Sequence, residues 1–91
     1  MPEYDVRVEV IEIRGKGECS FGHKVGDKTA IGEQNLCVWA EHVLLPFATA
    51  LRFGGEVPWK QQNRDVMEVA CPDADNPVIF RLTRVPSTQK K

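Results

Sequence analysis

The sequence predicts a small α+β domain, in which one helical segment packs on one face of an antiparallel or mixed sheet of about four strands. Three observations predict this class: strand-like alternation near the N-terminus, a helical repeat in the middle of the chain, and two strand-like segments around a turn near the C-terminus. The chain has 91 residues, of which 42% are hydrophobic. This length and composition predict a single globular domain over residues 1–91.

The first expected element is a strand over residues 5–14. Its apolar side chains alternate with charged ones as far as Val10, and the phase changes between Val10 and Ile11. A β-bulge produces such a change. The other face of this strand carries Asp5, Arg7 and Glu9. We expect that face to be solvated or packed on a partner.

A glycine-rich loop and a short strand over residues 28–31 come next. The helical segment then covers residues 35–53, where apolar residues recur at spacings of three and four, Trp39 among them. Asn35 is the expected N-cap. Pro46 either kinks this helix or separates two helices, because proline cannot donate to the preceding turn. Gly54 and the glycine after it end the segment.

Two further strands are expected over residues 66–71 and 78–85, joined by a turn rich in Asp, Asn and Pro. They form a β-hairpin. Arg81 and Arg84 are expected on a solvated strand edge. Residues 86–91 are basic and are expected to form a flexible tail.

Charge and hydropathy argue against two partner classes. The formal net charge is −1, so the chain lacks the basic excess that drives binding to nucleic-acid phosphates. No apolar run approaches the roughly 20 residues of a membrane span. The N-terminus does not resemble a signal peptide, and we therefore expect a cytoplasmic protein with reduced thiols.

Three cysteines occupy positions where the backbone is expected to change direction. Cys19 lies in the glycine-rich loop, where a buried hydrophobic residue has little reason to be. Cys37 lies in the expected first helical turn, where the helix dipole favours a thiolate. Cys71 ends a strand, on the face that points to the core. Each could also be a small packed side chain.

Two histidines and a glutamate accompany these cysteines. His23 follows Cys19 by four residues and could chelate the same ion, or cap its own loop. On a helix, His42 lies about 140° around from Cys37, so a partly buried structural role is expected. Glu41 shares the face of Cys37 and could be a ligand, hydrogen-bond to one, or act as a base. The alternative, which we favour, is a solvated surface residue.

Five segments of the chain carry a resemblance to a known group. They are residues 19–27 (CSFGHKVGD), 37–40 (CVWA), 51–59 (LRFGGEVPW), 71–73 (CPD) and the strand 78–84. Together they resemble a family of short prokaryotic proteins of about this length, whose function is unassigned. Its members often carry proline after the first two cysteines, where this chain has Ser20 and Val38. The resemblance implies that Cys19, His23, Cys37 and Cys71 act together, and it implies no reaction.

Arg52 and Trp59 belong to one of these segments. The Arg52 guanidinium could bind a carboxylate or phosphate through two hydrogen bonds. Trp59 could form the wall of a pocket or of an interface. The alternative is a helix C-terminus followed by a core aromatic residue.

These observations support three hypotheses. The first is a metal-binding domain in which Cys19, His23, Cys37 and Cys71 hold zinc or iron, since thiolate-rich tetrahedral sites suit both metals. The second is a metal-free module that binds a ligand or a protein and self-associates as a homo-oligomer, through the Trp59 region or a strand edge. The third is an enzyme with Cys37 as nucleophile and His23 or Glu41 as base.

Overall fold

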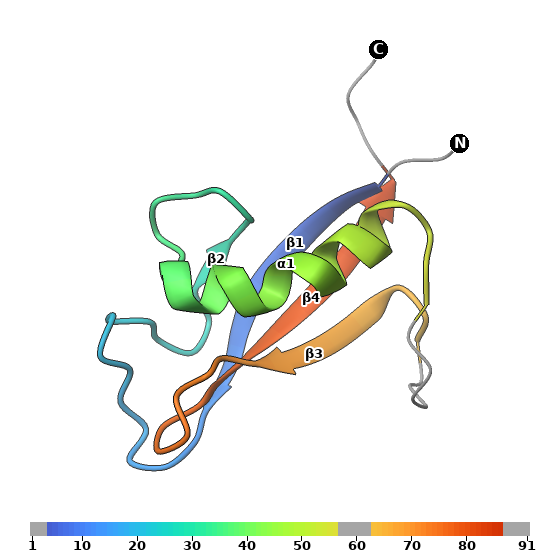
Figure 1. Cartoon of the computed structure of the whole chain (residues 1–91). Helices are drawn as coiled ribbons and strands as arrows, with labels where there is room; N and C mark the ends of the chain where they lie inside the picture. The colour runs from blue at the N-terminus through green and yellow to red at the C-terminus, as the bar shows by residue number, and fades with distance from the viewer. Residues whose placement is uncertain (1–3, 57–62, 87–91) are drawn as a thin grey trace.

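Figure 1 shows a computed structural model of the chain, which describes residues 4–56 and 63–86. One helix lies across a four-stranded sheet whose order is β2-β1-β4-β3, and every neighbouring pair is antiparallel. The predicted α+β class is therefore confirmed. The antiparallel alternative for the sheet is the correct one.

Strand β1 (Tyr4–Ile13) and strand β4 (Val78–Pro86) form the centre of the sheet. Val10 pairs with Phe80 and Glu12 pairs with Ile79, so one residue of β1, Ile11, has no counterpart in β4. This is the β-bulge that the change of phase predicts. It returns Ile13 to the core side, opposite Val78.

The two outer strands are shorter. Strand β2 covers only Lys28–Thr29, two residues fewer than expected, because the chain turns at Ala30. The N–H of Glu33 closes this turn by donating to the Ala30 carbonyl over 3.1 Å. Strand β3 (Val66–Ala70) forms the predicted hairpin with β4.

Helix α1 spans Val38–Arg52 and begins at a different N-cap from the one expected. Cys37 is the N-cap, because the side chain of Asn35 is used elsewhere: its amide donates to the Lys28 carbonyl over 3.2 Å. The helix continues through Pro46, so the alternative of two separate helices is wrong. Pro46 is exposed, and water can therefore hydrate the carbonyl that loses its helical partner.

The hydrophobic core lies between α1 and one face of the sheet. Its fully buried side chains are Val8, Val10, Leu44, Leu51, Met67, Val78, Phe80 and Leu82. The opposite face of the sheet carries a row of alternating charge across all four strands, made by Lys28, Glu9, Arg81 and Glu68. Arg81 and Glu68 are 3.4 Å apart in an ion pair. One face is thus apolar and covered, and the other carries this charged row.

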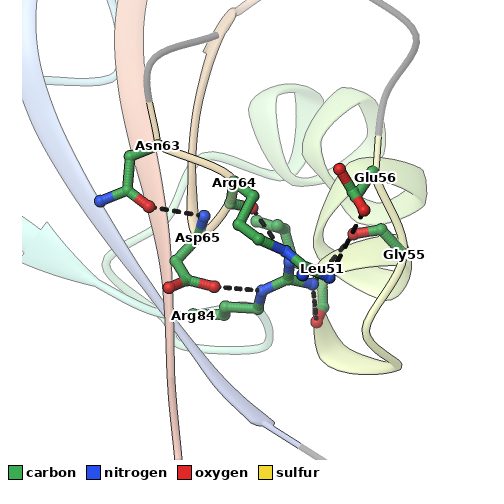
Figure 2. A network of polar contacts seen from close by, with 7 residues as sticks. All are labelled: Leu51, Gly55, Glu56, Asn63, Arg64, Asp65 and Arg84. Carbon is green, nitrogen blue, oxygen red and sulfur yellow. Dashed lines mark hydrogen bonds and ion pairs between the residues drawn. The ribbon is translucent and has the colours of Figure 1, made fainter.

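Arg84 corrects the expectation of a solvated strand edge, because its side chain is only 2% exposed (Figure 2). Its Nε donates to a carboxylate oxygen of Asp65 over 2.8 Å. Its two terminal nitrogens donate to three main-chain carbonyls, those of Leu51, Gly55 and Arg64, over 2.9 to 3.2 Å. The guanidinium thereby joins the end of α1 to the entry of β3 and fixes the helix on the sheet.

Candidate functional site

The three cysteines line one cavity of about 220 Å³. Cys19 comes from the glycine-rich loop, Cys37 from the start of α1, and Cys71 from the end of β3. All three are half-buried free thiols. The fold therefore brings together residues that lie 18 and 34 positions apart in the sequence.

Close packing of two loops places Cys19 beside the hairpin. The N–H of Arg14 donates to the Pro77 carbonyl over 3.0 Å, and the N–H of Lys16 donates to the side-chain carbonyl of Asn76 over 2.7 Å. Between them, Gly15 has a positive φ of 70°. A Cβ atom there would lie 2.1 Å from the Asp75 carbonyl oxygen, so only glycine permits this approach.

The β3–β4 turn holds Cys71 in a fixed orientation. A carboxylate oxygen of Asp73 accepts hydrogen bonds from the N–H groups of Asp75 and Asn76, at 2.9 and 3.1 Å. After this turn, the N–H of Val78 donates to the sulfur of Cys71 over 3.2 Å. The same two residues are also joined by the Cys71 N–H, which donates to the Val78 carbonyl over 2.9 Å. The sulfur thus has a defined hydrogen-bond donor.

His23 supports the start of α1 from outside the helix. Its Nε2 accepts a hydrogen bond of 3.2 Å from the N–H of Cys37, one of the helix N-terminal donors that have no partner within the helix. The ring is 5% exposed and lies between Phe21 and Phe80, with centroid distances of 4.7 and 5.4 Å. Burial lowers the pKa of His23, and the charge of Asp27 opposes this larger effect. A neutral ring with its proton on Nδ1 fits this hydrogen bond.

The other candidate residues lie away from the thiol cavity. Glu41 accepts a hydrogen bond from the N–H of Gly32, which ties α1 to the turn after β2. Arg52 lines a second cavity near the other end of the helix and lies over the Phe53 ring, 5.5 Å from its centroid. His42 is exposed, contrary to the partly buried role expected for it. Trp59 lies outside the described residues.

Sequence reasoning missed part of the cavity lining. Trp39 was expected on the buried face of the helix, but it is 72% exposed and lines the cavity together with Phe21, which is 49% exposed. Asp73 and Asn76 supply polar lining from the turn. The sequence signal that could have found these residues is their proximity to cysteines, since each lies within five positions of one.

The shared cavity is not an assembled metal centre. Among residues 4–56 and 63–86, no group of three or more His, Cys, Asp or Glu side chains is placed to hold a metal ion. The three thiols therefore surround the cavity without meeting at one point.

No protein-family model, curated protein or solved structure matches the chain. The family resemblance of the five segments therefore stays a prediction. Within the part of the chain that the structure describes, no helix is both long and apolar enough to span a membrane.

Proposed function

We propose that this protein is a small metal-binding domain in which Cys19, Cys37 and Cys71 are the thiolate ligands. The observation that supports the proposal most strongly is their convergence on one cavity from three separate segments. Thiolate-rich sites suit zinc, iron and other soft ions. The N–H of Val78 would remain a hydrogen-bond donor to the Cys71 sulfur, as donors commonly do for sulfur ligands.

Metal binding would draw the thiolates together. A cavity of about 220 Å³ is much larger than an ion, so the ligands must close on it. The loop around Cys19 contains glycines at positions 17, 22 and 26, and an added Cβ at any of them would meet no other atom within 4 Å. Metal binding would require this loop to move. The turn that holds Cys71 is anchored and would provide the fixed side of the site.

We assign His23 a positioning role and leave the fourth coordination position to solvent or a small ligand. The Nε2 lone pair of His23 is already used by the N–H of Cys37, whose sulfur belongs to the ligand set. His23 would become the fourth ligand only by giving up that hydrogen bond. An open fourth position is the arrangement that catalytic zinc sites share.

Metal analysis of untagged protein, reconstituted with zinc under reducing conditions without chelator, tests the proposal. We expect about one ion per chain for the wild type. Cys37→Ser should lower the affinity at least about tenfold, because it removes a ligand, whereas His23→Gln should keep the stoichiometry. Cobalt substitution should give a thiolate charge-transfer band in the wild type. Equal and negligible metal in wild type and Cys37→Ser would exclude this function.

A metal-free ligand site is the second candidate, and the exposed aromatic side chains at the cavity favour it. Trp39 and Phe21 are both about half exposed or more, although each lines the cavity. A small apolar ligand would bury both. If the metal-free protein binds an apolar fluorescent probe with a change in tryptophan emission that a Trp39→Phe variant loses, and zinc binds no more tightly to wild type than to Cys37→Ser, this candidate replaces the first.

A cysteine-dependent enzyme receives less support from the contacts. A base for Cys37 would have to face its sulfur, but the Nε2 of His23 faces its main-chain N–H. The carboxylate of Glu41 is engaged with Gly32.

A further inference from the structure

Within the described residues, the first part of strand β1 has no paired strand on the β2 side. Strand β2 pairs only with Val8 and Glu9, and the N-terminal part of β1 extends past it (Figure 1). Among the residues that the structure describes, none pairs with Val6 on the β2 side, although Ala30 and Ile31, which follow β2, border a groove beside it. At Val6, β1 rather than β2 is therefore the outermost strand of the sheet.

The main chain of Val6 points toward this open edge. At Val10, the N–H donates to the Asp27 carbonyl and the carbonyl accepts from the Gly26 N–H, both on the β2 side, at 2.9 and 2.8 Å. The side to which the main-chain N–H and carbonyl point alternates from one residue to the next along a strand. Val6 and Val10 are four residues apart, so the N–H and carbonyl of Val6 also point to the β2 side. On the other side, Val6 lies opposite Arg84, whose N–H donates away from β1 to Asp65.

A groove of about 440 Å³ runs beside this edge, between the sheet and α1. It is the second cavity named above. Its lining is mostly apolar, with Val6, Ala30, Ile31, Leu45, Ala48 and Thr49, and it also includes the charged residues Asp5 and Arg52. Leu45 is 48% exposed although it lies on this lining. The Thr49 hydroxyl donates to the Leu45 carbonyl over 2.7 Å and so satisfies its own donor within the helix.

We propose that an extended peptide segment of a partner protein adds to β1 at this edge, as an antiparallel strand in line with β2. Main-chain hydrogen bonds to Val6 would fix the register, and an apolar side chain opposite Val6 would enter the groove. This is β-strand addition, a mode that open strand edges permit.

The charges beside Val6 define the peptide further. Strand alternation places the side chains of Asp5 and Arg7 on the face opposite to Val6, although Asp5 also borders the groove, and neither forms an ion pair with another described residue. In the next row, the sheet itself places Lys28 opposite Glu9. An acidic residue opposite Arg7 and a basic residue opposite Asp5 would extend this pattern. The peptide should therefore read acidic, apolar, basic from its N-terminus.

A second copy of the chain has the required order of charges, but its strand would collide with β2. Its own Asp5, Val6 and Arg7 have the required order. In that register, however, the Tyr4 of the copy would lie opposite Val8, where Thr29 already pairs. A free peptide avoids this conflict if its strand starts at the residue opposite Arg7. The partner segment is thus an N-terminal end, or it turns away at that point.

Amide NMR titration with a designed probe tests the proposal. The probe is Glu-Val-Lys-Val-Thr-Gly with a free amino terminus, and its control is the charge-reversed Lys-Val-Glu-Val-Thr-Gly. We expect the first peptide to shift the amide signals of Val6, Ile31 and Ala48, and to bind about threefold tighter or more than the control. A double variant, Asp5→Lys with Arg7→Glu, should prefer the control peptide instead.

Three outcomes would overturn it. One is the absence of shifts with either peptide at millimolar concentration. Another is an unchanged peptide preference in the double variant, which would mean that the charges do not set the register. The third is a concentration-dependent dimer in sedimentation analysis that the double variant retains and that protects the Val6 amide, because a second copy would then occupy the edge.

Discussion

Arg84 is a buried charged residue, and each of its three guanidinium nitrogens donates a hydrogen bond within the protein. It lies on the core-facing side of β4, opposite Val6 in β1, and its guanidinium carbon is 5.2 Å from the centre of the Tyr4 ring. Its hydrogen bonds reach one carboxylate and three carbonyls from segments distant in the sequence. Two of those carbonyls belong to the end of α1 and the turn after it, where cations are favoured by the helix dipole.

Replacing Arg84 should therefore be costly. We expect Arg84→Met to lower the free energy of unfolding by about 3 to 5 kcal/mol, because it leaves buried carbonyls without donors. Urea denaturation measures the change. The control is Arg81→Met, which removes an exposed ion pair with Glu68 and should cost about 1 kcal/mol or less. Equal effects would contradict the role assigned to Arg84.

His23 should give the fold a dependence on pH. Burial lowers its pKa below the ordinary value of 6.5, so the unfolded chain takes up the proton first as the pH falls. Its contribution is complete above about pH 6.5 and is lost as the pH falls through the lower folded value. His23→Gln should flatten this part of the stability profile.

At the scale of elements, the loops around the thiol cavity depend on one glycine. Gly15 combines a positive φ with the close approach to Asp75, whereas Gly17 has a φ of 79° and nothing within 4 Å of an added Cβ. A side chain at either position would have to adopt a left-handed backbone conformation. Only at Gly15 would it also collide with a neighbouring atom, the Asp75 carbonyl oxygen.

Alanine at these two glycines should separate the two effects. Gly17→Ala should cost about 1 to 2 kcal/mol, from the left-handed backbone alone. Gly15→Ala should cost more and should also raise the rate at which a thiol reagent labels Cys19, because the two loops must move apart. Denaturation and labelling kinetics measure both. Similar labelling rates in the two variants would show that the contact does not position Cys19.

The elements also show where sequence reasoning succeeds and where it cannot. The alternation of β1, its bulge and the β3–β4 hairpin were predictable because each is encoded by neighbours in the sequence. The start of the helix was not, because the amide of Asn35 bonds β2 instead of capping. Trp39 was misplaced for another reason: the buried face of the helix is made by Ala40, Leu44, Ala48 and Leu51, and Trp39 lies about 100° around the helix from Ala40.

For the whole molecule, the cysteines could be named from the sequence as a candidate set, but their shared cavity could not. That cavity depends on the contact between the loop after β1 and the hairpin turn, and on the N-cap position of Cys37. Arg84 was also missed, because three of its four partners are main-chain carbonyls, which leave no mark in the sequence.

The three ligand segments join different parts of the fold, so metal binding should stabilise the whole domain. An ion that binds only the folded state, at a concentration one hundred times its dissociation constant, should add about 2.7 kcal/mol to the free energy of unfolding. Urea denaturation with and without zinc measures this gain. Cys19→Ser, Cys37→Ser and Cys71→Ser should each remove most of it, because each removes one anchor of the closed cavity. Ser20→Ala, at an exposed neighbour in the same lining, should keep it. A gain that survived all three cysteine substitutions would place the ion elsewhere.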